Sequence, residues 1–275
     1  MKPIIIEPFK LDADLKLTQE HKDFFKQNGF LSLANITHTE DLDKVRVSYD
    51  RIFAEQAGRN EGNQFDLGGT DEDDAPPNLP QILHPDKYAP EMRQSALYAN
   101  VQTIIQQFLG PEATTDFHHA ILKPAGHGIA TPWHQDAAYW DPNLLHKSVS
   151  IWTPLQEATL ENGCMHFVPY TQNIEIVEHR HINNDPKIHA LELTEAAMPH
   201  VKNVVACPLS PGGATIHNGY TLHYTPPNRS ATPRRALILG GSIPATQLDK
   251  QRTFSWQENE QTARLARAAA ANKNT

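Results

Sequence analysis

Three His-x-Asp pairs in the chain have donor atoms that divalent iron accepts, imidazole nitrogens and carboxylate oxygens. They are His21 with Asp23, His84 with Asp86, and His134 with Asp136. The first pair lies in a helical pattern, where residues i and i+2 point about 200° apart and cannot hold one ion. The second pair lies among prolines, so the sequence leaves its side-chain directions unspecified.

The third pair is the best candidate because residues 133–139 form an extended-looking run. On a strand, residues i and i+2 share a face, which would place the His134 imidazole beside the Asp136 carboxylate. A facial triad of two histidines and one carboxylate needs one more histidine from a neighbouring strand. His217 and His223 are the candidates.

Arg234 favours His223 as the third ligand. It follows His223 by eleven positions, whereas the neutral Asn228 stands at that offset from His217. A facial triad leaves three open positions on octahedral Fe(II), two for a 2-oxoacid and one for O₂. The far carboxylate of a diacid cosubstrate would need a cation, and arginine can grip it bidentately. The neighbouring Arg235 competes for this role, because only one of two successive strand residues points inward.

The elements that must position these residues are predicted from periodicity and turn residues. Helices are expected over 18–28, 37–53 and 97–108, because apolar residues recur there at helical spacing. Between about 114 and 244, short extended segments alternate with turns, which is typical of a β-sandwich or barrel. These strands are expected at 117–123, 130–140, 148–157, 164–169, 203–208, 213–218, 221–225 and 234–243.

The order of these elements suggests one elaborated domain over 1–275. It would have a helical N-terminal part over about 1–112, a β-core over about 113–245 and a C-terminal helix over about 254–272. A polar, His-rich insertion at 171–202 interrupts the core. Its position makes it a candidate lid over the site, whereas its individual histidines are better explained as part of a solvated loop.

Composition narrows the class of partner. The net charge is −8, from 24 Lys+Arg and 32 Asp+Glu, which argues against nucleic acid or an anionic membrane as the main partner. No apolar run approaches the roughly 18 residues of a spanning helix, and no signal-peptide pattern is present. Cys164 and Cys207 make no disulfide framework. We expect a cytoplasmic protein that acts on a small molecule, and the sequence does not specify its oligomeric state.

The combined pattern resembles the phytanoyl-CoA dioxygenase family of Fe(II)/2-oxoglutarate-dependent oxygenases. The resemblance rests on His134-x-Asp136, on His223 and on the residues five and eleven positions beyond it, Asn228 and Arg234. Lys123-Pro124, Trp152 and the segment 161–169 agree as well. The match covers residues 80–244 well, and the N-terminal helices are also similar to the family.

The resemblance implies a double-stranded β-helix (a cupin-like jelly roll) with helices packed outside. His134, Asp136 and His223 would bind Fe(II), and Arg234 with Thr225 would hold the far carboxylate of 2-oxoglutarate. Trp152 would line the cosubstrate pocket, or simply pack in the core. The Asp136 carboxylate would stand where halogenating relatives carry a small residue, so the resemblance implies hydroxylation, demethylation or a related oxidation.

Two positions depart from the family pattern. Gln81 stands where relatives carry a lysine that touches 2-oxoglutarate, and His119 stands where many carry methionine. Their cofactor-binding roles are therefore the weakest part of the resemblance. Tyr139 and Trp140 follow the iron-binding pair directly and could line the substrate site, or serve only in packing.

The sequence favours a dioxygenase that oxidises a small metabolite, in natural-product biosynthesis, and releases succinate and CO₂. Two alternatives remain. A sensor on the same fold would bind metal and 2-oxoglutarate without turnover, and the complete ligand set argues against it. A cupin-type metalloenzyme would need no cosubstrate, and the placement of Arg234 argues against that.

Overall fold

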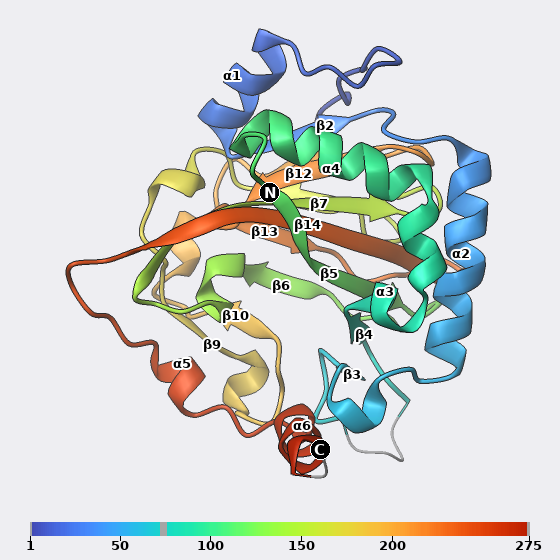
Figure 1. Cartoon of the computed structure of the whole chain (residues 1–275). Coiled ribbons are helices and arrows are strands. Elements are labelled where there is room, and N and C mark those ends of the chain that lie inside the picture. The colour runs from blue at the N-terminus through green and yellow to red at the C-terminus, as the bar shows by residue number, and fades with distance from the viewer. Residues whose placement is uncertain (1, 72–75, 274–275) are drawn as a thin grey trace.

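The computed structural model describes residues 2–71 and 76–273 (Figure 1). Within them, two β-sheets face each other across the centre of the molecule. The larger sheet has the strand order β2-β12-β7-β14-β5-β4-β3, and the smaller one has the order β1-β11-β8-β13-β6. Strands β9 and β10 form a separate two-stranded sheet.

The strands of the larger sheet are β2 (Phe30–Leu33), β12 (Ala214–Asn218), β7 (Leu144–Pro154), β14 (Arg234–Gln247), β5 (Thr114–Lys123), β4 (Pro80–Leu83) and β3 (Gln64–Asp66). Those of the smaller sheet are β1 (Ile4–Ile5), β11 (Val205–Cys207), β8 (Met165–Phe167), β13 (His223–Thr225) and β6 (Thr131–His134). The hairpin consists of β9 (His179–His181) and β10 (Leu191–Leu193). Among the pairs inside the two main sheets, β1 with β11 is parallel and the others are antiparallel.

The α-helices are α1 (Gln19–Asn28), α2 (Thr39–Ala54), α3 (Pro85–Tyr88), α4 (Ala96–Leu109), α5 (Ser255–Glu258) and α6 (Ala263–Asn272). The 3₁₀ turns are η1 (Arg59–Glu61), η2 (Pro90–Gln94), η3 (Asp136–Tyr139), η4 (Thr171–Asn173), η5 (Ile182–Asn184) and η6 (Met198–His200). No helix in the part of the chain that the structure describes has the length and apolar character needed to cross a bilayer.

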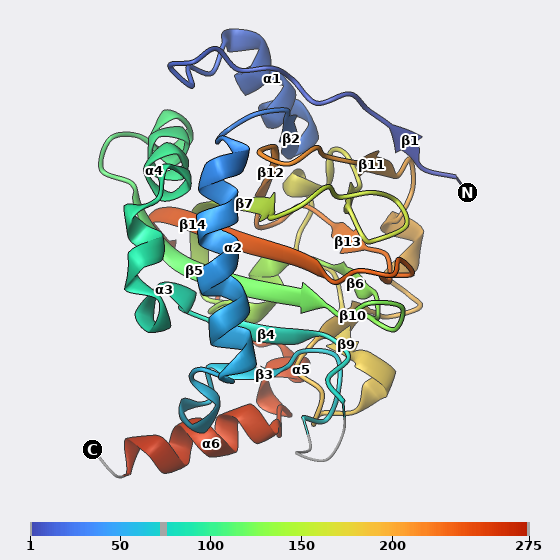
Figure 2. The ribbon, with the colours of Figure 1, turned by 90° about the vertical axis from the view of Figure 1, so that its right-hand side faces the viewer.

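Helices α2 and α4 cover the outer face of the larger sheet (Figure 2). Each presents one apolar stripe, for example Leu42 and Ile52 on α2 and Ile104 on α4, to sheet residues such as Leu237. Burial of each such side chain contributes roughly 2 kcal/mol. This packing fixes the larger sheet as a rigid wall for the site on its inner face.

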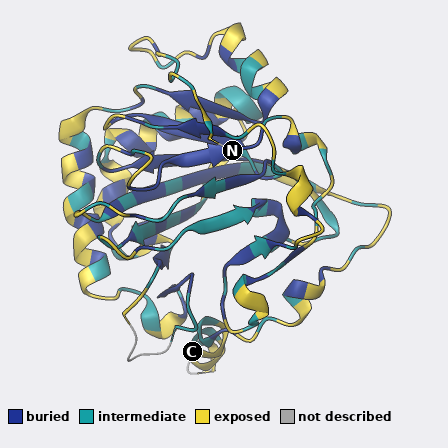
Figure 3. Cartoon of the chain, turned by 180° about the vertical axis from the view of Figure 1, so that it is seen from behind, coloured by how far each residue is buried: buried dark blue, intermediate teal, exposed yellow. Residues whose placement is uncertain are grey.

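A second core lies between the two sheets, where Trp152 of β7 and Phe167 of β8 are buried in one cluster. Figure 3 shows that the strands are mostly buried or intermediate, while the surrounding helices alternate exposed and buried residues. Cys164 and Cys207 join this cluster as free, buried thiols. The predicted mainly β jelly-roll core with flanking helices is confirmed, and its two sheets stay open rather than closing into a barrel.

Several predicted boundaries differ from the structure. The expected strand 130–140 ends at His134, and Asp136 begins the turn η3 instead. Helix α2 begins at Thr39, two residues later than expected, and the Thr37 hydroxyl donates to Asp41 instead of capping the helix. The single C-terminal helix expected over 254–272 is two helices, α5 and α6. The insertion 171–202 carries the β9–β10 hairpin.

Candidate metal and cosubstrate site

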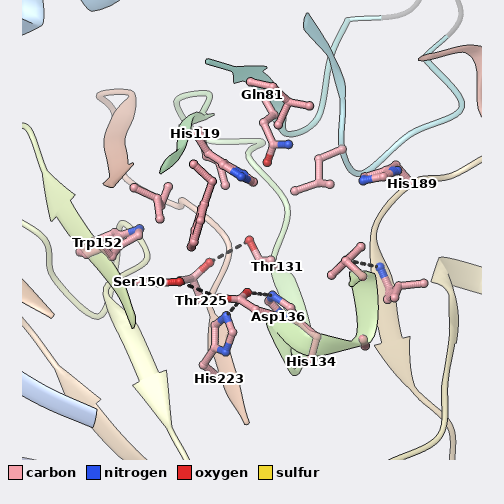
Figure 4. Close-up of a pocket in the computed structure, with 18 of the residues that line it drawn as sticks. Gln81, His119, Thr131, His134, Asp136, Ser150, Trp152, His189, His223 and Thr225 are labelled. Atoms are coloured by element: carbon pink, nitrogen blue, oxygen red, sulfur yellow. Dashed lines mark hydrogen bonds and ion pairs between the residues drawn. The ribbon is translucent and has the colours of Figure 1, made fainter. Parts of the chain in front are cut away.

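Three side chains converge at the end of β6, where the smaller sheet faces the larger one (Figure 4). His134 ends β6, Asp136 starts η3, and His223 starts β13 directly opposite His134 in the strand register. The Oδ1 atom of Asp136 lies 3.7 Å from His134 Nε2 and 3.3 Å from His223 Nε2. One ligand atom from each residue lies within 4.8 Å of the others, a spacing that allows one ion between them.

Backbone carbonyls orient both imidazoles. The Nδ1 atom of His134 donates to the carbonyl of Pro132 at 2.7 Å, and that of His223 donates to Thr221 at 2.9 Å. Because a carbonyl only accepts, these bonds fix the tautomer and leave both Nε2 lone pairs directed at the shared point. Burial also lowers the pKa of His134 to about 3, so this imidazole is neutral and able to ligate.

The second oxygen of Asp136 is held by two donors from the larger sheet. Oδ2 accepts from Ser150 Oγ at 2.9 Å and lies 3.1 Å from His217 Nε2. Ser150 and His217 are themselves register partners across β7 and β12. Burial favours the protonated acid, but His223 and His217 outweigh it and hold the pKa of Asp136 well below its usual range. The triad therefore presents two imidazole Nε2 atoms and one carboxylate oxygen.

Arg234 is a buried cation without a partner. It is 1% exposed, and among the described residues its Nε and Nη1 atoms have no hydrogen-bond acceptor. Its guanidinium lies 5.4 Å from the Trp152 ring. Burial lowers the pKa of Arg234 to about 10, so it stays charged at neutral pH. A buried, uncompensated charge is costly, which indicates that an anion completes this site.

The triad and Arg234 line one cavity of about 480 Å³ between the sheets. Arg235, the next residue, points outward, where its guanidinium forms a bidentate pair with Asp50. The alternation of β14 thus decides between the two arginines. His217, the other candidate third ligand, lines the same cavity but contacts Asp136 rather than joining the triad.

Comparison with known proteins identifies the family. The model of the family described as "Phytanoyl-CoA dioxygenase (PhyH)" matches residues 25–236, well over half of the chain. The chain belongs to the phytanoyl-CoA dioxygenase family. As a member of this family, the protein is a non-haem iron dioxygenase that uses Fe(II), 2-oxoglutarate and O₂.

Relatives of this PhyH protein differ in how much of it they match. A probable alpha-ketoglutarate-dependent hypophosphite dioxygenase of Stutzerimonas stutzeri is 23% identical, over 80% of this chain and 77% of its own. Mouse peroxisomal phytanoyl-CoA dioxygenase is 25% identical over 62% of this chain, and the match spans 52% of the mouse protein. Among solved structures, EvdO2 from Micromonospora carbonacea var. aurantiaca has a TM-score of 0.74 and 34% identity, covering 88% of this chain and 97% of its own.

The donor set of this PhyH chain fits the family's metal. Two imidazole nitrogens and one carboxylate on one side of an ion form the facial arrangement that non-haem Fe(II) adopts, with the other positions open. The buried guanidinium of Arg234, whose Nε and Nη1 atoms have no acceptor among the described residues, is a suitable counter-charge for the carboxylate of a bound diacid. EvdO2 has also been crystallised with 2-oxoglutarate, with a TM-score of 0.73 to this chain.

The remaining predicted residues of the PhyH site all line the cavity, but in different environments. The Thr225 hydroxyl donates to that of Thr131 at 3.0 Å, across the β13–β6 register pair. Trp152 belongs to the inter-sheet core and also contacts Arg234, so its two predicted roles are compatible. Gln81 and His119 lie across the cavity from the triad (Figure 4). Burial lowers the pKa of His119 to about 4.

Tyr139 and Trp140 also line the cavity, at the end of η3. The Tyr139 hydroxyl accepts a hydrogen bond from the Leu191 amide at 2.8 Å, which ties the β9–β10 hairpin to the triad's own turn. The Trp140 ring fills the space over Gly219, where a Cβ would lie 2.2 Å from it. Tyr139 therefore both lines the cavity and holds the β9–β10 hairpin in place.

The other His-x-Asp pairs make no comparable site. His21 and Asp23 lie on α1, where the His21 ring caps the helix by accepting from the Thr18 amide. Asp86 pairs with His118 at 2.6 Å rather than with His84. Sequence reasoning did not find the roles of Ser150 and His217 on Asp136, nor the C-terminal residues Glu260 and Arg264 in the wall. The sequence signals for Ser150 and His217 were weak: the high number of histidines, and the strand alternation that puts Ser150 on the same face as Trp152.

Proposed function

We propose that this protein oxidises a C–H bond of a small organic metabolite, by hydroxylation or a related reaction such as demethylation, in natural-product biosynthesis. The observation that carries the proposal is that one cavity contains both a set of three metal ligands and a buried arginine without an anion. The triad offers ligand atoms on one side of an ion, and Arg234 offers unpaired donors to an anion. The cavity volume of about 480 Å³ leaves room for an organic substrate beside the cosubstrate.

In this proposal, His134, Asp136 and His223 hold Fe(II), and Ser150 and His217 keep the carboxylate oriented. Arg234 anchors the far carboxylate of 2-oxoglutarate, with Thr225 and Trp152 beside it. When bound, Fe(II) and 2-oxoglutarate together supply O₂-dependent oxidation, with release of succinate and CO₂. Asp136 occupies a ligand position with a carboxylate, which favours oxidation over halogenation. The protein's further contribution is a dry pocket that fixes which C–H bond is presented.

The cavity is lined by residues from Leu67 to Arg264, so we propose that the whole chain works as one domain. Solved neighbours from nogalamycin biosynthesis, such as the carbocyclase SnoK (18% identity, TM-score 0.68), support a tailoring role. The two free cysteines, Cys164 and Cys207, suit a reducing compartment, and we propose the cytoplasm. Tyr139 and Trp140 are our candidates for substrate contact, and Gln81 and His119 are candidates for contact with 2-oxoglutarate.

The decisive experiment measures succinate released from 2-oxoglutarate by the Fe(II)-loaded protein over a panel of metabolites. We expect release that rises with the true substrate and is absent in Asp136→Ala. Binding of 2-oxoglutarate with no substrate-stimulated succinate would support a sensor instead. Product formation without 2-oxoglutarate would support a cosubstrate-independent metalloenzyme.

A further inference from the structure

The C-terminal segment forms one wall of the cavity. Helices α5 and α6 cross beneath β3 and the β9–β10 hairpin (Figure 1). Three hydrogen bonds fix this segment to the end of the turn that carries Asp136. The indole of Trp256 donates to the carbonyl of Ala138, and the side-chain amide of Gln257 donates to the carbonyls of Ala138 and Trp140. Trp256, Gln257, Glu260 and Arg264 all line the cavity. The C-terminal wall is therefore held in register with the triad.

Arg264 is a cation of this wall that lacks a partner. Among residues 2–71 and 76–273, its half-buried side chain has no hydrogen-bond acceptor and no carboxylate within 4 Å, and its Nε atom is buried. One turn further along α6, Arg267 is paired with Asp71. Arg264 instead lies with its guanidinium 5.1 Å from the ring of Phe65, which positions it without neutralising it.

The acid nearest in sequence is already engaged. The Oε1 atom of Glu260 accepts from His189 Nδ1 at 2.7 Å and from the Thr262 hydroxyl at 3.1 Å. Glu260 still favours the charged form of Arg264 electrostatically, although burial lowers the pKa of this arginine. His189 lies on the far side of the cavity from Trp152 (Figure 4), so this cluster is remote from the proposed 2-oxoglutarate anchor.

We infer that Arg264 binds a carboxylate group of the substrate, an inference that rests on the proposed function. Arg234 is committed to the cosubstrate in that function, which leaves Arg264 as the cation free to meet a second anion. A guanidinium grips a carboxylate through two parallel N–H donors. The nearby negative charge of Glu260 disfavours a dianionic phosphate in the same place, so a single carboxylate fits best.

The test uses the full chain loaded with Mn(II) and saturating 2-oxoglutarate under nitrogen, so that no turnover occurs. The probes are acetate, benzoate and 4-hydroxyphenylacetate, each paired with its neutral amide. Tryptophan fluorescence reports binding, because Trp140 and Trp256 line the cavity. We expect at least one carboxylate to bind roughly tenfold more tightly than its amide, the size of one charge-assisted hydrogen bond.

Arg264→Gln should remove this preference while the affinity for 2-oxoglutarate stays the same, and Arg264→Lys should keep part of it. Arg229→Gln removes the same charge from an exposed position outside the cavity and should keep all of it. Thermal melting of each variant checks folding. The inference is overturned if no carboxylate outbinds its amide in the wild type, or if Arg264→Gln retains the preference. If the wild type does not bind 2-oxoglutarate, the proposed function is wrong. The inference about Arg264 then fails as well, because it requires the cosubstrate-bound state.

Discussion

His217 Nε2 lies 3.1 Å from Asp136 Oδ2, the carboxylate oxygen that is turned away from His134 and His223. The contact crosses from the larger sheet to the turn that follows β6 in the smaller one. It fixes the rotation of the carboxylate, so that Oδ1 stays directed at the two ligand nitrogens. The orientation of the triad therefore depends on side chains from both sheets of the jelly roll.

Replacing His217 should weaken metal binding without removing a ligand. We expect His217→Phe to raise the Mn(II) dissociation constant about 10- to 100-fold, the usual effect of losing a bond to a metal-binding side chain. His217→Gln retains an N–H donor and should recover part of the affinity. Calorimetric titration with Mn(II) measures both, and an unchanged constant in His217→Phe would show that the contact does not orient Asp136.

Arg234→Met should raise the dissociation constant of 2-oxoglutarate at least about 100-fold, because a bidentate charge-assisted contact is lost. Without 2-oxoglutarate the same variant should melt at a higher temperature, since an unpaired buried charge has been removed. Arg235→Met is the matched control on the outer face of β14. It breaks the partly exposed pair with Asp50 and a long bond to the Pro233 carbonyl, both outside the cavity, and should leave 2-oxoglutarate binding intact. Equal effects of the two variants would contradict the assignment.

Asp86 makes the free energy of unfolding depend on pH in the acid range. Burial favours protonation, but the bonds from His118 and Arg93 outweigh it and hold the pKa of Asp86 at about 2, against an ordinary value of 3.8. A depressed carboxyl pKa stabilises the fold above the ordinary value, by about 2 kcal/mol here, and this is lost as the pH falls toward 2. The free-energy difference between wild type and Asp86→Asn, from urea unfolding, should be constant above pH 5 and shrink from pH 4 downward. A difference that grows on acidification would refute this.

Asp71 should control how firmly α6 is held. Its carboxylate pairs with Arg267 of α6 and with Arg59 of η1. Asp71 has a positive φ of 60°, which asparagine tolerates, so Asp71→Asn removes the charge with little backbone strain. We expect a loss of about 1 kcal/mol, felt as roughly fivefold faster amide hydrogen exchange across 263–272. Exchange in α4, on the other side of the larger sheet, is the internal reference and should not change.

The sequence by itself determined those features of this protein that depend on residues close together along the chain. The i, i+2 spacing of His134 and Asp136, the offset from His223 to Arg234 and the alternation of β14 are all local properties of a strand or turn. The stripes of α2 and α4 are local as well, since helical periodicity repeats within a few residues. These patterns were sufficient for a mainly β core with flanking helices, and for the triad and Arg234, which line one cavity. The jelly roll and the roles of the other predicted site residues came from the resemblance to the family.

Tertiary structure alone decided the contacts between residues that have no fixed separation along the chain. Nothing local predicts that His217 meets Asp136 or that Glu260 meets His189. The same holds for Arg264, which has no partner within the described part of the chain. The direction of Asp136 was also a tertiary result, because the chain leaves β6 at His134 and enters a 3₁₀ turn where a longer strand was expected. Such contacts depend on how sheets, hairpin and C-terminal helices pack together, and periodicity within one element carries no information about that.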